Sequence, residues 1–281
     1  MKIIISKSRK NYHSPLRYPG GKTSLLPFFE KIIENHGLEK ITYIEPFAGG
    51  AGAALALLLS EKVDRIVIND LDKAIYAFWK SSVFNSTKFI KKIKITPVTI
   101  SEWRKQKAIY IDPKANLFDL GFATFFLNRT NTSGILDGGP IGGLKQKGKY
   151  KINARFNKNT LIERIRQIAH HKNKISIFNK DGLQLISEYL NNKNAFIYLD
   201  PPYFEKGSSL YLNHYKKADH EALAKKLNGN PDAFWLLTYD NKKEIKLLYL
   251  DRKIVNFFLN YNVYESRKGR EVMIFSDAFA N

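Results

Sequence analysis

The chain has 281 residues, and its 46 Lys and Arg against 26 Asp and Glu give a formal net charge of +20. A hydrophobic content of 44% is enough to build a core and excludes an intrinsically disordered chain. Because there is no Cys, a disulfide framework, a thiolate metal site and a thiol nucleophile are excluded, and a reducing cytoplasm is the expected location. The apolar runs are too short for a signal peptide or a membrane span.

The first part of the chain alternates between helical and strand patterns. A helix is expected over 25–33, a strand over 41–44, a helix ending at 59 and a strand over 65–69. A glycine-rich turn joins the first strand to the second helix. This order of elements predicts a βαβ unit, in which the two strands are parallel.

The middle of the chain has a different pattern and carries most of the positive charge. Residues 76–160 have a net charge of +12, and the rest of the chain has only +8. A general bias toward Lys would not produce this uneven distribution, so an anionic partner such as nucleic acid is favoured. Helical patterns run to about 127, and residues 128–150 contain six Gly, which predicts a long loop or irregular hairpin.

The α/β pattern resumes at about 160. Strands are expected at 175–178, 195–199, 233–238, 253–258 and 271–276, and the last two should form an antiparallel edge pair. We therefore predict a discontinuous α/β domain, formed by residues 1–75 and 160–281. A basic, mainly helical insert over 76–159 would interrupt it.

The clearest candidate site is Asp-Pro-Pro-Tyr at 200–203, directly after a strongly apolar strand. Open α/β sheets bind their ligands at the carboxyl ends of such strands. Pro201 and Pro202 lack N–H donors and leave carbonyl oxygens as acceptors, while Asp200 adds a charged acceptor and Tyr203 an aromatic face. This combination suits a planar heterocycle with an exocyclic amine. The alternative is a strand-terminating turn in which Asp200 only caps the backbone.

Together with Glu-Pro-Phe-Ala-Gly-Gly at 45–50, this motif resembles the S-adenosylmethionine-dependent amino-methyltransferases that act on DNA. Arg-Tyr-Pro-Gly-Gly-Lys at 17–22 narrows the resemblance to the Dam-like family (D12 class, α group) of DNA adenine-N6 methyltransferases. The resemblance implies a Rossmann-like methyltransferase sheet, mostly parallel with an antiparallel C-terminal edge pair. It also implies that the insert is a target-recognition domain.

The same resemblance implies where S-adenosylmethionine, and its product S-adenosylhomocysteine, would bind; it implies no metal. The glycine turn would hold the methionine part, Glu45 would face its amino group, Asp70 the ribose hydroxyls and Asp181 the adenine. Alternatively, Asp70 and Asp181 are helix N-caps and Glu45 is an ordinary strand-end carboxylate. The expected cofactor residues are Tyr18, Gly20, Gly21, Lys22, Glu45, Phe47, Gly49, Gly50, Asp70, Asp181 and Asp200.

The insert is expected to bind DNA. Asn and Arg side chains can pair with adenine and guanine edges, and Thr can contact the thymine methyl group. Residues 125–134 contain these residue types and resemble the DNA-contacting loop of the family, with Arg129 the clearest match. A solvated basic hairpin without sequence specificity is the alternative. The expected DNA-binding residues are Lys22, Asn128, Arg129, Thr130, Asn131, Lys145, Lys147 and Arg155.

From these residues and the resemblance we predict a cytoplasmic, monomeric, site-specific DNA methyltransferase that acts on a flipped-out adenine in double-stranded DNA. A cognate restriction endonuclease would be a natural partner. Serine commonly replaces Asp200 in cytosine-N4 enzymes, so Asp200 favours adenine. The alternatives are cytosine-N4 methylation, methylation of RNA or of a protein amide, and a non-catalytic nucleic-acid-binding relative.

Overall fold

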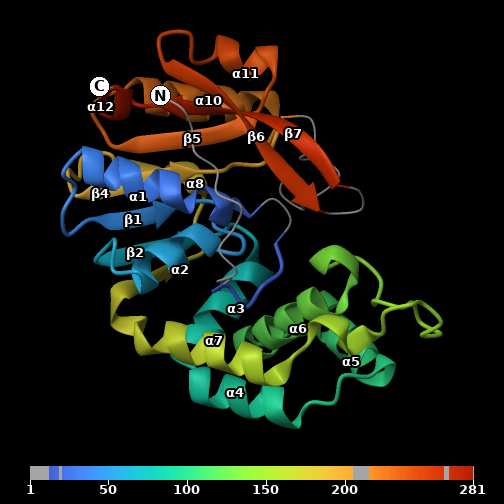
Figure 1. Cartoon of the computed structure of the whole chain (residues 1–281). Coiled ribbons are helices and arrows are strands. Elements are labelled where there is room, and N and C mark those ends of the chain that lie inside the picture. Colours follow the sequence, from blue (N-terminus) through green and yellow to red (C-terminus); the bar gives the residue numbers. More distant parts are fainter. Residues whose placement is uncertain (1–12, 19–20, 205–214, 263–265, 281) are drawn as a thin grey trace.

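A computed structural model describes residues 13–18, 21–204, 215–262 and 266–280 (Figure 1). In this part of the chain, seven strands form one sheet in the order β3-β2-β1-β4-β5-β7-β6. Their bounds are β1 (Thr42–Glu45), β2 (Arg65–Asn69), β3 (Ile175–Phe178), β4 (Ala195–Leu199), β5 (Trp235–Asp240), β6 (Lys253–Asn262) and β7 (Ser266–Phe275).

The sheet is parallel from β3 to β5 and ends in an antiparallel pair. β1 pairs in parallel with β2 and β4, and β7 is antiparallel to both β5 and β6. The predicted mostly parallel sheet with an antiparallel C-terminal edge pair, a Rossmann-like methyltransferase fold, is therefore confirmed. β6 and β7 are longer than predicted, because their backbone pairing extends to Asn262 and Ser266, beyond the apolar residues that marked them in the sequence.

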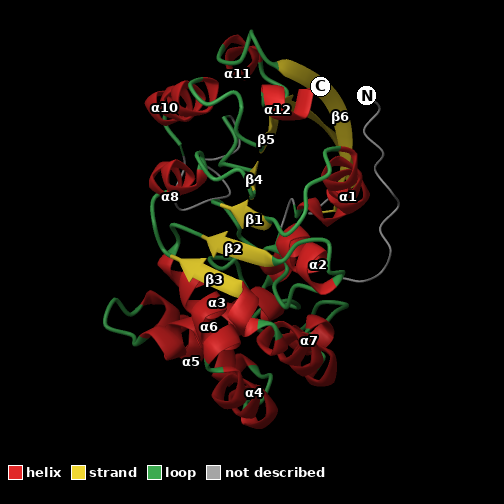
Figure 2. Ribbon diagram, turned by 90° about the vertical axis from the view of Figure 1, so that its left-hand side faces the viewer, coloured by secondary structure: helices red, strands yellow, loops and turns green. Residues whose placement is uncertain are grey.

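Helices cover both faces of the sheet (Figure 2). Side chains alternate along β4: Phe196 and Tyr198 join the hydrophobic cluster under α1 (Leu26–Asn35) and α2 (Gly52–Leu59), while Ile197 and Leu199 face the opposite cluster. That second cluster includes residues of α8 (Gly182–Tyr189) and α10 (Lys217–Asn228). Burial on both faces explains why the central strands read as continuous apolar runs.

The middle of the chain is helical. Its helices are α3 (Lys73–Phe84), α4 (Ser86–Ile95), α5 (Ile100–Ile111), α6 (Leu117–Thr130) and α7 (Lys158–His170). The predicted insert boundaries, 76 and 159, fall inside α3 and α7. α6 packs closely along α3: a Cβ atom at Gly121 would lie 2.3 Å from the Ala77 carbonyl oxygen. The division into two domains remains a prediction.

Between α6 and α7 the chain is irregular, as predicted, but the irregular part starts later than position 128. Asn128 to Thr130 belong to the last turn of α6, and the 3₁₀ helices η2 (Thr132–Gly134) and η3 (Ile152–Arg155) follow. The other short elements are η1 (Lys22–Leu25), η4 (Lys172–Lys174), α11 (Lys243–Leu247) and α12 (Asp277–Ala280). None of the helices within the described ranges has the length and hydropathy that a membrane crossing requires.

Candidate active site

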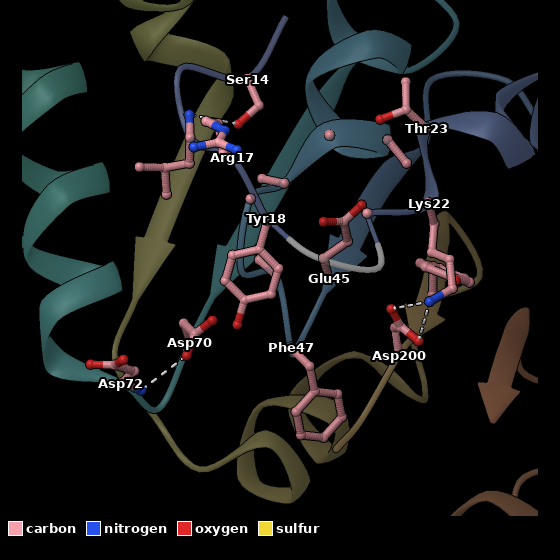
Figure 3. A pocket seen from close by; sticks show the side chains of 18 of the residues that line it. Ser14, Arg17, Tyr18, Lys22, Thr23, Glu45, Phe47, Asp70, Asp72 and Asp200 are labelled. Atoms are coloured by element: carbon pink, nitrogen blue, oxygen red, sulfur yellow. Dashed lines mark hydrogen bonds and ion pairs between the residues drawn. The ribbon is translucent and has the colours of Figure 1, made fainter. Parts of the chain in front are cut away.

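The carboxyl ends of three neighbouring strands bring three carboxylates to one edge of the sheet. Glu45 ends β1, Asp200 follows β4 and Asp70 follows β2. Since β1 lies between β2 and β4 and all three are parallel, these residues line one cavity of ≈ 770 Å³ (Figure 3). This volume is in the range of small-molecule sites, and the place is where such sheets bind ligands.

Lys22 and Asp200 form a buried ion pair in this cavity. The Lys22 ammonium, in a residue only 6% exposed, donates hydrogen bonds to the Asp200 Oδ1 and Oδ2 atoms at 2.9 and 2.7 Å. Burial alone would lower the pKa of Lys22, but attraction to Asp200 and Glu271 outweighs it and the pKa is raised. The Thr238 hydroxyl donates a further hydrogen bond to Asp200 Oδ1 at 3.0 Å. The carboxylate is therefore held from two sides.

Tyr203 lies against the same ion pair. Its hydroxyl accepts a hydrogen bond from Lys22 at 2.9 Å and donates one to Glu271 Oε1 at 2.5 Å. Pro202 lines the cavity, whereas Pro201 is buried. Glu271 and Thr238 were not among the predicted site residues. Glu271 had one visible signal, because it is a charged residue at the start of an otherwise apolar strand pattern.

Asp70 binds the backbone of the glycine turn. Its Oδ2 accepts from the Gly49 N–H and its Oδ1 from the Asp72 N–H, both at 2.9 Å. The N-cap of α3 is Asp72, which accepts from the Ala74 N–H at 2.8 Å, so the alternative of Asp70 as the cap is wrong. Burial raises the pKa of Asp70 to about 7.

The glycine turn is packed under an aromatic ring. A Cβ atom at Gly49 or Gly50 would lie 2.5 or 2.8 Å from the Tyr18 side chain, so these positions must lack a side chain to admit the ring. The Tyr18 ring thus makes the close approach that these glycines permit, and binding of the methionine part of the cofactor by the turn stays a prediction. Tyr18, Gly21 and Gly50 line the cavity. Gly20 lies outside the described residues.

Glu45 is buried and accepts a hydrogen bond from the Ala54 N–H in the first turn of α2, at 3.0 Å. Burial raises the pKa of Glu45 to about 8. The Phe47 ring, which also lines the cavity, packs onto Gly182, where a Cβ atom would lie 2.5 Å away. Asp181 is the N-cap of α8 and accepts from the Leu183 N–H at 2.9 Å, which confirms the capping alternative. Asp181 also lines the cavity, so a contact with the cofactor stays a prediction.

Three of the residues expected to contact DNA are used inside the protein. Asn128 is 1% exposed; it accepts from the Arg17 N–H at 2.7 Å and donates to the Arg17 and Gly134 carbonyls. The Thr130 hydroxyl and the Asn131 amide, both buried, also bond to backbone carbonyls. For these three, the expectation of base contact needs correction, because Asn128 and Asn131 fix the loop after α6 and Thr130 bonds back within α6.

Arginines gather where the cavity meets the insert. The four that line it are Arg17, Arg129, Arg155 and Arg164. Arg129 donates to the Arg155 carbonyl, at 2.8 Å from its Nε. Burial, followed by the charges of the other three, lowers the pKa of Arg129 to about 9. None of the four forms an ion pair with an acidic residue of the described ranges. Arg155, Lys145 and Lys147 are exposed.

Comparison with known proteins identifies the family. The D12 class N6 adenine-specific DNA methyltransferases match residues 18–263. The Type II methyltransferase M.MjaIII of Methanocaldococcus jannaschii is 24% identical over 73% of each chain. The Type II methyltransferase M.CviBI of Paramecium bursaria Chlorella virus NC1A is 24% identical over 74% of this chain and 76% of its own. The modification methylase StsI of Streptococcus sanguinis is 25% identical over 98% of this chain and 39% of its own. With its sheet, its strand-end carboxylates and a match over most of its length, the chain belongs to the D12 class N6 adenine-specific DNA methyltransferase family.

Proposed function

We propose that this protein is a site-specific methyltransferase that transfers the methyl group of S-adenosylmethionine to N6 of a flipped-out adenine in double-stranded DNA. The observation that carries the proposal is the Asp200 carboxylate, held by Lys22 and Thr238 beside the cavity. Family membership supports adenine as the target.

The groups that line the cavity fit S-adenosylmethionine. Five acidic side chains line it, which suits a ligand with an amino group, a sulfonium charge and a ribose diol. Glu45 would face the amino group, Asp70 the ribose and Asp181 the adenine of the cofactor, beside the Phe47 ring. When bound, S-adenosylmethionine supplies the electrophilic methyl group. For Asp70 to bind the ribose while it holds Gly49, its remaining lone pairs would accept from the hydroxyls.

The chain's own groups would orient the nucleophile. The lone pair of adenine N6 is delocalised into the ring, which makes this nitrogen a poor nucleophile. Hydrogen bonds from N6–H to the Asp200 carboxylate and the Pro201 carbonyl would favour a pyramidal nitrogen whose lone pair points at the methyl group. Tyr203 would stack on the base, and Asp200 would accept the proton that N6 loses. Catalysis would then come mainly from positioning and electrostatics.

The insert would hold the DNA. A stacked base cannot reach such a cavity, so the adenine would be flipped out of the duplex. The four arginines at the mouth lack acidic partners among the described residues, which favours phosphate contacts there. Lys145 and Lys147 are exposed and would extend this contact. We propose that residues 76–159 form the target-recognition domain, with Arg129 and Arg155 as its base or phosphate contacts.

The test is methyl transfer to unmodified duplex DNA by the purified chain. After incubation with S-adenosylmethionine carrying an isotopically labelled methyl group, the DNA is digested to nucleosides and analysed by mass spectrometry. We expect labelled N6-methyladenine in one sequence context, which single-molecule sequencing of the same DNA would define. Detection of labelled N4-methylcytosine in place of N6-methyladenine would favour the cytosine-N4 alternative. If binding occurred without methyl transfer, the non-catalytic alternative would be favoured.

A further inference from the structure

Glu271 presents a buried carboxylate oxygen that accepts no hydrogen bond from the described residues. The residue is 1% exposed and lies on β7, opposite Asp240 of β5. Its Oε1 accepts the hydrogen bond from the Tyr203 hydroxyl, but its Oε2 has no hydrogen-bond partner among the described residues. The Lys22 ammonium forms a long ion pair with Oε2, at 3.9 Å. Buried polar atoms are normally satisfied, so an unsatisfied carboxylate oxygen requires an explanation.

A second observation concerns Asp200. Both of its oxygens accept hydrogen bonds from Lys22, and Oδ1 also accepts one from Thr238. Under the proposed function, the same carboxylate must accept a hydrogen bond from adenine N6. With two hydrogen bonds on Oδ1 and one on Oδ2, the carboxylate has little acceptor capacity left, and transfer of the ammonium to another acceptor would open it to the substrate. A buried ammonium that leaves one carboxylate needs another acceptor.

We propose that Glu271 is a positioning residue that receives the Lys22 ammonium when Asp200 binds the target adenine. This inference rests on the proposed function. A shift of Lys22 by roughly 1 Å toward Oε2 would bring the pair to charge-assisted hydrogen-bond distance. Lys22 stays paired throughout, and an Asp200 oxygen becomes free for N6–H. Tyr203 is bonded to both partners and keeps its ring in place during the exchange.

The exchange depends on the charge of Glu271. Among the described residues, the charged and titratable groups that face it are Lys22 of η1, Asp200 and Tyr203 after β4, and Asp240 of β5. Burial raises the pKa of Glu271 to about 7; Lys22 opposes this effect and Asp200 adds to it. Only the ionised carboxylate can take over the ammonium. The exchange is therefore favoured above pH 7 and is lost as the pH falls through this value.

The first experiment measures the single-turnover methylation rate of the wild-type protein and Glu271→Gln as a function of pH. In the wild type the rate should rise between about pH 6 and about pH 8. In Glu271→Gln it should be about 10- to 100-fold lower at the upper end, the loss expected for one charge-assisted hydrogen bond, and the rise should be absent. Asp240→Asn is the matched control, because it removes a carboxylate from the facing position on β5. It should keep the rise but move it to lower pH, since the charge of Asp240 helps to raise the pKa of Glu271.

The outcomes separate a positioning role from a structural one. A uniformly lower rate in Glu271→Gln with the wild-type pH profile would overturn the inference, and so would a rate equal to that of the wild type. Both results require an active wild-type protein. If the wild type does not methylate adenine, the proposed function fails instead.

A second experiment does not depend on the folding of a variant. In a structure of the wild-type protein bound to target DNA with the adenine in the cavity, the Lys22 Nζ atom should lie within hydrogen-bond distance of Glu271 Oε2. If Lys22 still donates to both oxygens of Asp200 in that complex, the inference is refuted.

Discussion

The Lys22 ammonium donates hydrogen bonds to both oxygens of Asp200, although 178 positions separate the two residues in the chain. The Lys22 side chain is 4% exposed and that of Asp200 23%. Screening by water is therefore weak at the lysine, and the pair is held more firmly than a surface salt bridge. It fixes the segment before α1 against the end of β4, and so defines one wall of the cavity.

Replacement of Asp200 should stop the reaction. In Asp200→Ala both the acceptor for N6–H and the main partner of Lys22 are lost, so the single-turnover rate should fall by at least ~100-fold, as for other preorganised polar groups at reacting atoms. Asp200→Asn keeps the shape and one acceptor oxygen and serves as the milder variant. Circular dichroism and S-adenosylmethionine binding report whether the fold is retained. A folded Asp200→Ala protein with near-normal turnover would refute the mechanism.

Arg155 should contribute to DNA binding through its charge. It is exposed at the mouth of the cavity, where no acidic residue of the described ranges pairs with it. If it neutralises one phosphate, Arg155→Ala should weaken binding and reduce the slope of log K against log salt by about 0.9. Fluorescence anisotropy with a labelled duplex over a salt series measures this slope. The control is Lys62→Ala, which removes an exposed charge between α2 and the amino end of β2. This variant should leave the slope unchanged. An unchanged slope in Arg155→Ala would exclude the contact.

Glu45 should make stability depend on pH. Burial raises its pKa from 4.5 to about 8, so between these values the folded protein holds a proton that the unfolded chain has released. The free energy of unfolding should therefore fall as the pH rises through this window. Glu45→Gln stays neutral and should show a smaller fall, measured by urea unfolding at several pH values. Glu34→Gln, at an exposed position of α1, is the control. A constant difference between wild type and Glu45→Gln across the window would contradict the prediction.

Gly121 should be essential for the packing of α6 on α3. Because a Cβ atom there would lie 2.3 Å from the Ala77 carbonyl oxygen, Gly121→Ala should force the helices apart and cost about 1–3 kcal/mol of stability. Gly139→Ala introduces the same methyl group where no atom of the described residues lies within 4 Å and should be nearly neutral. Denaturant unfolding of the two variants compares them directly. Equal stability of Gly121→Ala and the wild type would show that this contact is not tight.

Much of the sheet could be predicted from the sequence, because its determinants are local. Central parallel strands are buried on both faces, so β2 and β4 stand out as short apolar runs. Their bounds, and those of the edge strand β3, agree with the prediction. The carboxylates that follow β1, β2 and β4 could be assigned to one edge, since the carboxyl ends of neighbouring parallel strands coincide. Asp181 could also be predicted as the N-cap of α8, because it is a short polar side chain directly before a helical pattern.

Only the tertiary structure decided which side chains meet. The pairing of Lys22 with Asp200 and the approach of Glu271 to both depend on how η1, β4 and β7 pack, and no periodicity in the sequence encodes a contact between such distant positions. Asn128 is a second example. Its position in a polar segment predicted DNA contact, but the structure shows that its buried side chain bonds to the Arg17 backbone. Local pattern determined the strands and the residues at their ends. Packing decided which of those residues share a proton, a charge or a cavity, because hydrogen bonds and ion pairs require a few ångströms of proximity that only the folded chain creates.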